Sequence, residues 1–259
     1  MRLATDPSRE AVHDFRTTSR RLETLLEQLL PVQDRNQRKL LKLLGRIRRR
    51  AGRIRDIDVQ LAALRSFKVP QEPRRKTRLI HGLIDLRMQH ERKLAKILKR
   101  RLVTELKKRI RRASQDLSGT SSRDPLVVAN EILRSASTAG PLNDEVLHRY
   151  RIAVKRARYA AEFAPPSVES KRFIAGLERL QDALGNWHDW MTLTRTASEQ
   201  LGGLDQSSLV AALHNITRVK FRHAVAAVSL SRSHSAAESP VAPGAKAATR
   251  TGTSHNQAA

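Results

Sequence analysis

The sequence predicts an all-α fold, and three observations support that prediction. Leu, Ala, Arg, Lys, Glu and Gln, which all favour helices, dominate the 259 residues. Apolar residues recur at spacings of three and four, which place them on one helix face, and strand-like alternation is absent. Proline and glycine fall between these periodic segments, where they end helices.

Three helices are predicted in the first half of the chain, and prolines separate them. The first starts near Asp6 or Ser8, residue types that suit the cap position, and it ends at Pro31. The second and third cover residues 35–67 and 74–115, and each has an apolar face.

A polar linker over residues 118–124 precedes four further predicted helices. These cover about residues 125–140, 142–163, 168–201 and 207–230. From Ser231 onward Ser, Ala, Pro, Gly and Thr dominate and no apolar periodicity survives, so residues 231–259 are expected to form a disordered tail. The folded domain is therefore expected to cover residues 1–230.

The charge balance indicates a polyanionic ligand. Lys and Arg number 50 against 25 Asp and Glu, which gives a formal net charge of +25. Residues 1–230 hold 47 basic and 24 acidic side chains, so the charge belongs to the folded domain and not to the tail. A domain so charged repels itself, and a bound polyanion would offset the repulsion. DNA, RNA, anionic lipid and polyphosphate are the candidates, and an inert basic surface is the alternative.

Several classes of protein are not expected from this sequence. The absence of cysteine excludes disulfides and thiolate sites, and it fits a reducing, cytoplasmic compartment. We see no signal peptide and no apolar run long enough to span a membrane. The motifs of nucleotide-binding loops, zinc proteases and serine hydrolases are absent as well. We therefore expect no enzyme activity, no cofactor, no metal site and no membrane association.

The most informative feature of the sequence is an internal repeat. Residues 12–21 and residues 147–156 both fit the pattern apolar-His-x-aromatic-Arg-x-x-x-basic-Arg. A second repeated pattern, Gly-x-x-basic-Asp, covers residues 52–56 and 185–189. The two members of each pair lie 133 to 135 residues apart, and a near-constant offset indicates two copies of one helical unit.

Each copy, at about residues 8–117 and 125–230, places a histidine and two basic residues on one helix face. The residues are His13, Arg16 and Arg20 in the first copy and His148, Arg151 and Lys155 in the second. Like charges one turn apart repel each other, so the arrangement is unfavourable in itself. Its presence in both copies therefore indicates a functional role. Arg binds phosphate oxygens through a planar fork, and a nearby anion favours protonated His, so binding should strengthen at mildly acidic pH. A solvated basic face is the alternative interpretation.

The Gly-x-x-basic-Asp pairs predict supporting roles. Asp56 and Asp189 are expected to pair with basic side chains and orient them, more than to act chemically. Glu162 and Asp189 show no evident acidic partner for catalysis. Gly52 and Gly185 cost about 1 kcal/mol each inside a helix, which suggests that they permit close helix packing.

The four motifs together resemble the CHAD domain, a conserved-histidine α-helical domain. Residues 147–159 and 177–189 are very similar to that family, and the resemblance covers most of residues 8–230. It implies two four-helix bundles related by a pseudo-two-fold axis that enclose a basic groove. It also implies binding of inorganic polyphosphate and association with polyphosphate granules. The ExExK strand of the CYTH domain, which often accompanies CHAD, is absent, so a stand-alone CHAD protein is expected.

The resemblance implies a polyphosphate-binding role for His13, Arg16, Arg20, Arg21, His148, Arg151, Lys155 and Arg158. It extends that role to Arg49, Arg53 and Arg55 on the second helix, and to His188, where the second copy departs from the usual motif.

Nucleic acid is the main rival ligand, since RNA and DNA offer the same phosphate chemistry. Single-strand binders usually stack bases on aromatic side chains, and this chain has only nine aromatic residues. We expect Phe15, Tyr150 and Phe163 to be core residues, whereas Trp187 and Trp190 could be core or binding residues. A scaffold that polyphosphate only localises is a third possibility, and protein partners cannot be read from the sequence.

Overall fold

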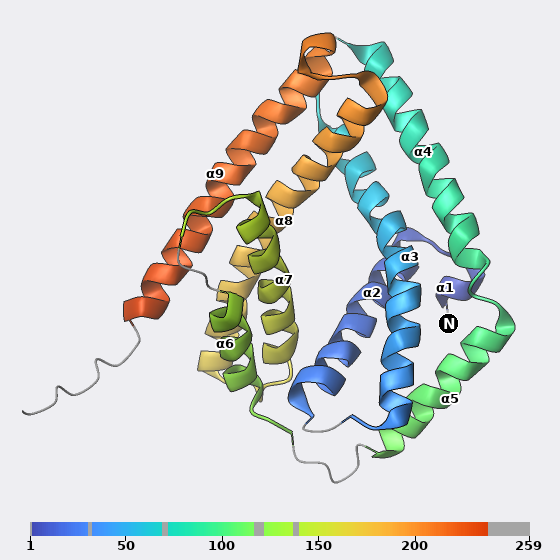
Figure 1. The fold of residues 1–259 in the computed structure, drawn as a ribbon, viewed down its shortest axis with the longest axis vertical. Coiled ribbons are helices and arrows are strands. Elements are labelled where there is room, and N and C mark those ends of the chain that lie inside the picture. The colour runs from blue at the N-terminus through green and yellow to red at the C-terminus, as the bar shows by residue number, and fades with distance from the viewer. Residues whose placement is uncertain (1, 31–32, 69–71, 117–121, 137–139, 238–259) are drawn as a thin grey trace, which may run out of the picture.

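A computed structural model describes residues 2–30, 33–68, 72–116, 122–136 and 140–237. All regular structure in these ranges is helical, which confirms the predicted all-α fold (Figure 1). The helices are α1 (Arg2–Thr5), α2 (Arg9–Thr24), α3 (Arg35–Ser66), α4 (Pro73–Ala95), α5 (Arg100–Asp116), α6 (Pro125–Ala136), α7 (Asp144–Ala161), α8 (Val168–Leu201) and α9 (Ser208–Ala237). A π-helical turn, Leu25–Leu29, extends α2, and a 3-10 turn, Leu204–Gln206, precedes α9.

Polar caps explain where several helices begin. The hydroxyl of Ser8 accepts the backbone N–H of Ala11 at 3.2 Å, so α2 starts at the later of the two predicted positions. Asp34 and Gln37 form a reciprocal capping box at the start of α3. Asn143 caps α7 in the same way as Ser8 caps α2. Local sequence thus sets the first turns of the helices that carry the repeated motifs.

Two predicted boundaries are wrong. The expected helix over residues 74–115 is two helices, because the chain turns at Lys96 before α5 begins. An unbroken helix of that length would span about 60 Å. The turn instead lets Leu83 of α4 and Leu106 of α5 reach different hydrophobic clusters. At the other end, α9 continues past Leu230 to Ala237, and the rest of the predicted tail lies outside the described residues.

Three hydrophobic clusters hold the helices together. One joins α6, α7, α8 and α9 around Trp187, which is 1% exposed. Another joins α1, α2, α3 and α5 with Leu94 at the end of α4, and Phe15 packs against it. The third joins α3 and α4 to α8 and α9, and Trp190 packs there, edge-on to Phe67 at 5.8 Å. Phe163, predicted to be core, is 40% exposed, so that prediction is wrong.

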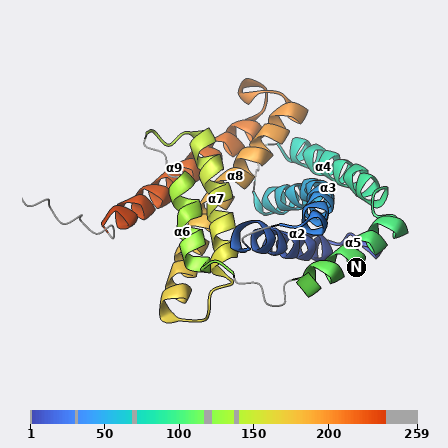
Figure 2. The same cartoon turned by 60° about the horizontal axis from the view of Figure 1, so that its bottom comes forward.

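The third cluster connects the two predicted repeat units, and two further helix pairs do the same. Helix α2 contacts α7, and α3 contacts α8. In Figure 2, α2 lies between α7 and α3. These contacts bring the repeated motifs face to face, although the pseudo-two-fold relation itself stays a prediction. Among the described helices, none combines the length and apolar character needed to cross a bilayer.

Candidate polyanion-binding cleft

A cleft of about 680 Å³ lies where α2 and α3 meet α7 and α8. Its lining is dominated by basic side chains, against three acidic ones. The basic group consists of His13, Arg16, Arg20, Arg21, Arg55, Arg151, Lys155, Arg156, Arg158 and His188, and the acidic group of Asp56, Asp182 and Asp189. Such a lining suits a ligand with several negative charges.

The cleft collects nine of the twelve residues predicted to bind. Three others lie outside its lining: His148, Arg49 and Arg53. His148 is adjacent, since its ring stacks on that of His188 with centroids 5.4 Å apart. Arg49 and Arg53 are exposed on α3 instead. The structure thus brings most of the predicted residues together at one cleft and places Arg49 and Arg53 outside its lining.

Helical spacing turns one face of α2 and one face of α7 into the cleft. On α2, Arg16 lies three residues after His13, and both line the cleft, while Val12 is buried in the core. Gly52 of α3 lies directly under the guanidinium of Arg16, so that a Cβ at this position would collide with it. Gly185 has open space around its Cα. Close packing therefore accounts for the first glycine and not for the second.

Two arginines from opposite walls are largely withdrawn from water. Burial lowers the pKa of Arg16, and the nearby carboxylate of Asp56 opposes that shift. Burial likewise lowers the pKa of Arg151, opposed first by Asp189, whose Oδ1 lies 4.0 Å from Arg151 Nη2. The Nε atom of Arg151 is buried and has no hydrogen-bond partner within the described residues. Both arginines thus retain unused capacity to bind an anion.

Lys155 lies between these arginines, and its charge is the most strongly disfavoured. Burial, followed by the positive charge of Arg151, lowers its pKa to about 8. Arg16 acts in the same direction, and Asp189 and Asp56 oppose it. The cleft is therefore a place where an additional positive charge is costly and an additional negative charge is favourable.

The two aspartates of the repeated Gly-x-x-basic-Asp pattern both line the cleft, as counterions to its cations. Burial raises the pKa of Asp56, although solvent still reaches its side chain, and Arg16 and His188 oppose the shift. Asp189 lies beside Arg151 and 3.6 Å from His188 Nδ1. This arrangement agrees with the predicted role of orienting basic side chains. Within the described residues, no group of three or more His, Asp and Glu side chains is placed to hold a metal ion.

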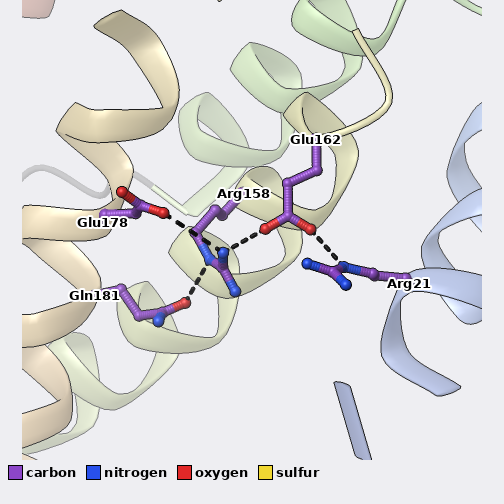
Figure 3. Close-up of polar contacts among 5 residues, drawn as sticks. All are labelled: Arg21, Arg158, Glu162, Glu178 and Gln181. Atoms are coloured by element: carbon purple, nitrogen blue, oxygen red, sulfur yellow. Dashed lines mark hydrogen bonds and ion pairs between the residues drawn. The ribbon is translucent and has the colours of Figure 1, made fainter. Parts of the chain in front are cut away.

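Glu162 links the two walls, a role that the sequence did not reveal. Its Oε2 accepts the Nε–H of Arg21 from α2 at 2.6 Å, and its Oε1 pairs with Arg158 of α7 (Figure 3). Arg158 also donates to Gln181 Oε1 at 3.0 Å and lies 3.8 Å from Glu178. The i, i+4 spacing of Arg158 and Glu162 could have suggested their pairing. No sequence signal marks Arg21 as the other partner, because the two residues are far apart in the chain.

Aromatic side chains contribute little to the cleft. The sequence left open whether Trp187 and Trp190 are core or binding residues. Trp187 is buried and is therefore a core residue. Tyr159 lines the cleft, and the guanidinium of Arg158 lies over its ring at 5.0 Å from the centroid. An aromatic ring already covered by arginine is poorly placed to stack on a base.

Comparison with known proteins agrees with this fold. The family model described as "CHAD domain" matches residues 2–198. The crystal structure of the CHAD domain from the plant Ricinus communis superposes with a TM-score of 0.62. That similarity covers 88% of this chain and 84% of the plant chain at 18% sequence identity, so it concerns the fold alone. A search of curated proteins finds no match. The chain belongs to the CHAD domain family.

Proposed function

We propose that the cleft binds inorganic polyphosphate. The observation that carries this proposal is the convergence of two basic helix faces, from α2 and α7, on one cavity. Both faces offer guanidinium groups, and α7 adds the ammonium group of Lys155; these groups suit phosphate oxygens.

The electrostatics of the cleft support an anionic ligand. Arg16, Arg151 and Lys155 each have a pKa below its ordinary value, mainly because burial disfavours their charged forms. A phosphate chain in the cleft would favour those charged forms and replace lost water with oxygen acceptors. Binding would thereby relieve a cost that folding imposes on the protein.

The shape and composition of the cleft favour polyphosphate over nucleic acid. A linear phosphate chain carries a charge on every repeat and has no bases to accommodate. Single-stranded RNA or DNA would need stacking surfaces, and the cleft offers Tyr159, whose ring is covered by Arg158. Nucleic acid remains the alternative ligand, and a direct competition experiment separates the two.

The test is competition at fixed salt. Labelled long-chain polyphosphate would be bound to the purified protein and displaced with unlabelled polyphosphate, RNA or double-stranded DNA at matched phosphate concentration. We expect polyphosphate to compete far better than either nucleic acid. If RNA or DNA competed equally well, the proposal would be wrong, and general binding of nucleic-acid backbones would take its place.

A double variant ties the ligand to the cleft. Arg16→Gln with Arg151→Gln removes one buried cation from each wall, and we expect a loss of polyphosphate affinity of at least tenfold, since each contact to a charged group is worth about 1.5–3 kcal/mol. Circular dichroism and the melting temperature check that the variant is folded. If the folded variant kept its affinity, polyphosphate would not bind in the cleft and the proposed site would be wrong.

We propose further that the protein binds polyphosphate without transforming it, in the cytoplasm, and that binding targets it to polyphosphate granules. A fluorescent fusion should then co-localise with granules, and the Arg16→Gln, Arg151→Gln variant should be diffuse. Co-localisation of both forms would show that something other than the cleft directs the protein.

A further inference from the structure

A second basic surface runs along α3 outside the cleft. Between Arg35 and Arg55 the chain has ten basic residues and no acidic residue. Six of the ten recur at alternating spacings of four and three, which places them in one row along the helix. We call this row the α3 stripe, and it consists of Arg35, Lys39, Lys42, Arg46, Arg49 and Arg53. All six side chains are exposed.

The α3 stripe differs from the other faces of the same helix in lacking counterions. Arg48, on the face toward α2, is buried and pairs with Glu23. Arg87 of α4 pairs with Asp58 near the other end of α3. Within the described residues, no carboxylate lies within ion-pair distance of any stripe side chain. The acidic residues that pack against α3 thus form ion pairs on its buried faces. The positive charges of the α3 stripe have no acidic counterion among the described residues.

Neighbouring cations strengthen the positive field of the row. His90 of α4 lies near its cleft-side end, and burial, Lys93, Arg53 and Arg50 all lower the pKa of that histidine. The groups that act on His90 are positive, and Glu91, which follows it on α4, pairs with Arg87.

The stripe leads to the cleft. Asp56, which lines the cleft, follows Arg49 by seven residues and Arg53 by three, and therefore continues the same row. From Arg35 to Arg53 the row extends about 27 Å along the helix axis, with a cation roughly every 5 Å. A chain that leaves the cleft beside Asp56 would meet Arg53 within one helical turn.

We propose that the α3 stripe extends the binding site beyond the cleft and holds the part of a long polyphosphate chain that the cleft does not contain. The protein consequently prefers long chains to short ones. This inference rests on the proposed function of the cleft. It also gives a role to Arg49 and Arg53, which lie outside the cleft lining.

The chemistry of the row favours polyphosphate over other extended partners. Its six members carry no aromatic ring on which bases could stack. They include no apolar residue that could enter a membrane, and the apolar face of α3 is buried in the protein. The ammonium groups of lysine and the guanidinium groups of arginine in a straight row match a linear anion that has no side groups.

The test compares two triple variants that remove the same charge. The stripe variant carries Lys39→Gln, Lys42→Gln and Arg46→Gln, none of which lines the cleft. The control variant carries Lys107→Gln, Lys108→Gln and Arg111→Gln, at positions that are exposed on α5. The unmodified protein and both variants are titrated with long-chain polyphosphate, tripolyphosphate and single-stranded RNA over a range of salt concentrations, and circular dichroism checks the folding of the variants.

We expect the stripe variant to lose at least tenfold in affinity for long chains and to bind tripolyphosphate normally. If all three cations contact phosphates, the slope of log affinity against log salt falls by about 2 for long chains. The control variant should change long-chain affinity by less than about threefold, because its three charges lie outside both the cleft lining and the row that the chain is proposed to follow, and salt screens their remaining effect.

Normal long-chain affinity in the stripe variant, or equal losses in the two variants, would overturn the extended site and leave the cleft intact. A parallel loss of single-stranded RNA binding, with RNA as tight as polyphosphate, would overturn the choice of ligand. If the unmodified protein bound neither long-chain polyphosphate nor tripolyphosphate, the proposed function itself would be wrong. That result would be known before any variant is made.

Discussion

Raising the pH from neutral to alkaline should weaken polyphosphate binding through one residue, Lys155. In the cleft its pKa is lowered to about 8, against an ordinary value of 10.5. The cause is burial, followed by the positive charges of Arg151 and Arg16, which Asp189 and Asp56 only partly offset.

The size of the effect follows from proton linkage. With a pKa of about 8, Lys155 is roughly nine-tenths charged at pH 7 and one-tenth charged at pH 9. If a bound phosphate chain restores the pKa to its ordinary 10.5, binding at pH 9 must take up nearly one proton. The affinity should therefore fall by roughly tenfold between pH 7 and pH 9.

The same shift destabilises the folded, ligand-free protein, and the sign can be stated. The folded pKa of Lys155 lies below its unfolded value, so the destabilisation is fully present below about pH 8. It disappears as the pH rises toward 10.5. Ligand affinity and intrinsic stability should thus change in opposite directions through the contribution of this one side chain.

Isothermal titration calorimetry in buffers of different ionisation enthalpy measures both the affinity and the protons taken up. The control variant is Lys155→Arg, whose guanidinium stays charged across the range, and it should show little pH dependence. An affinity for the unmodified protein that is constant from pH 7 to pH 9, with no proton uptake, would refute the reasoning about Lys155.

Three further substitutions separate binding from stability. Gly52→Ala should displace the guanidinium of Arg16 and reduce polyphosphate affinity several-fold, while the melting temperature holds or rises because Ala favours a helix by about 1 kcal/mol. The matched Gly185→Ala also adds a methyl group at the cleft, but this group meets no other atom within 4 Å, so the variant should raise the melting temperature and reduce affinity less than Gly52→Ala. Asp58→Asn breaks a buried pair with Arg87 outside the cleft, so we expect a loss of about 3–5 kcal/mol in unfolding free energy and no change in affinity per folded molecule. Denaturant unfolding and titration with polyphosphate measure the two quantities, and an affinity loss in Asp58→Asn or none in Gly52→Ala would contradict the assignment.

Much of the fold was accessible from the sequence because its signals are local. Capping residues such as Ser8 and Asn143 mark helix starts, and apolar spacing marks the faces that pack. The repeated histidine motif predicted which faces of α2 and α7 carry basic residues. That the two faces meet in one cleft came from the family resemblance, since spacing along one helix does not determine which helices are neighbours.

The features that the sequence did not reveal depend on tertiary contacts. Arg21 and Glu162 are separated by most of the chain, and their pairing follows from the packing of α2 on α7. The turn at Lys96 has no proline or glycine to mark it. It lets the earlier part of α4 pack in the third cluster, at Leu79 and Leu83, while α5 packs in the second cluster, which Leu94 at the end of α4 also reaches. In both cases the local sequence carries no signal, and tertiary packing determines the structure.

The distribution of carboxylates explains where the large positive charge of this protein is available. Several acidic residues pair with two arginines each or act at contacts between helices: Glu23 with Arg20 and Arg48, and Glu162 with Arg21 and Arg158. These pairs hold helices together, and they leave few carboxylates for the cleft and none for the α3 stripe. Because uncompensated like charges repel and destabilise a compact fold, a linear anion that reaches both surfaces would stabilise the protein as it binds. In this protein, then, holding the helices together and attracting a polyanion are linked through the placement of the same few acidic residues.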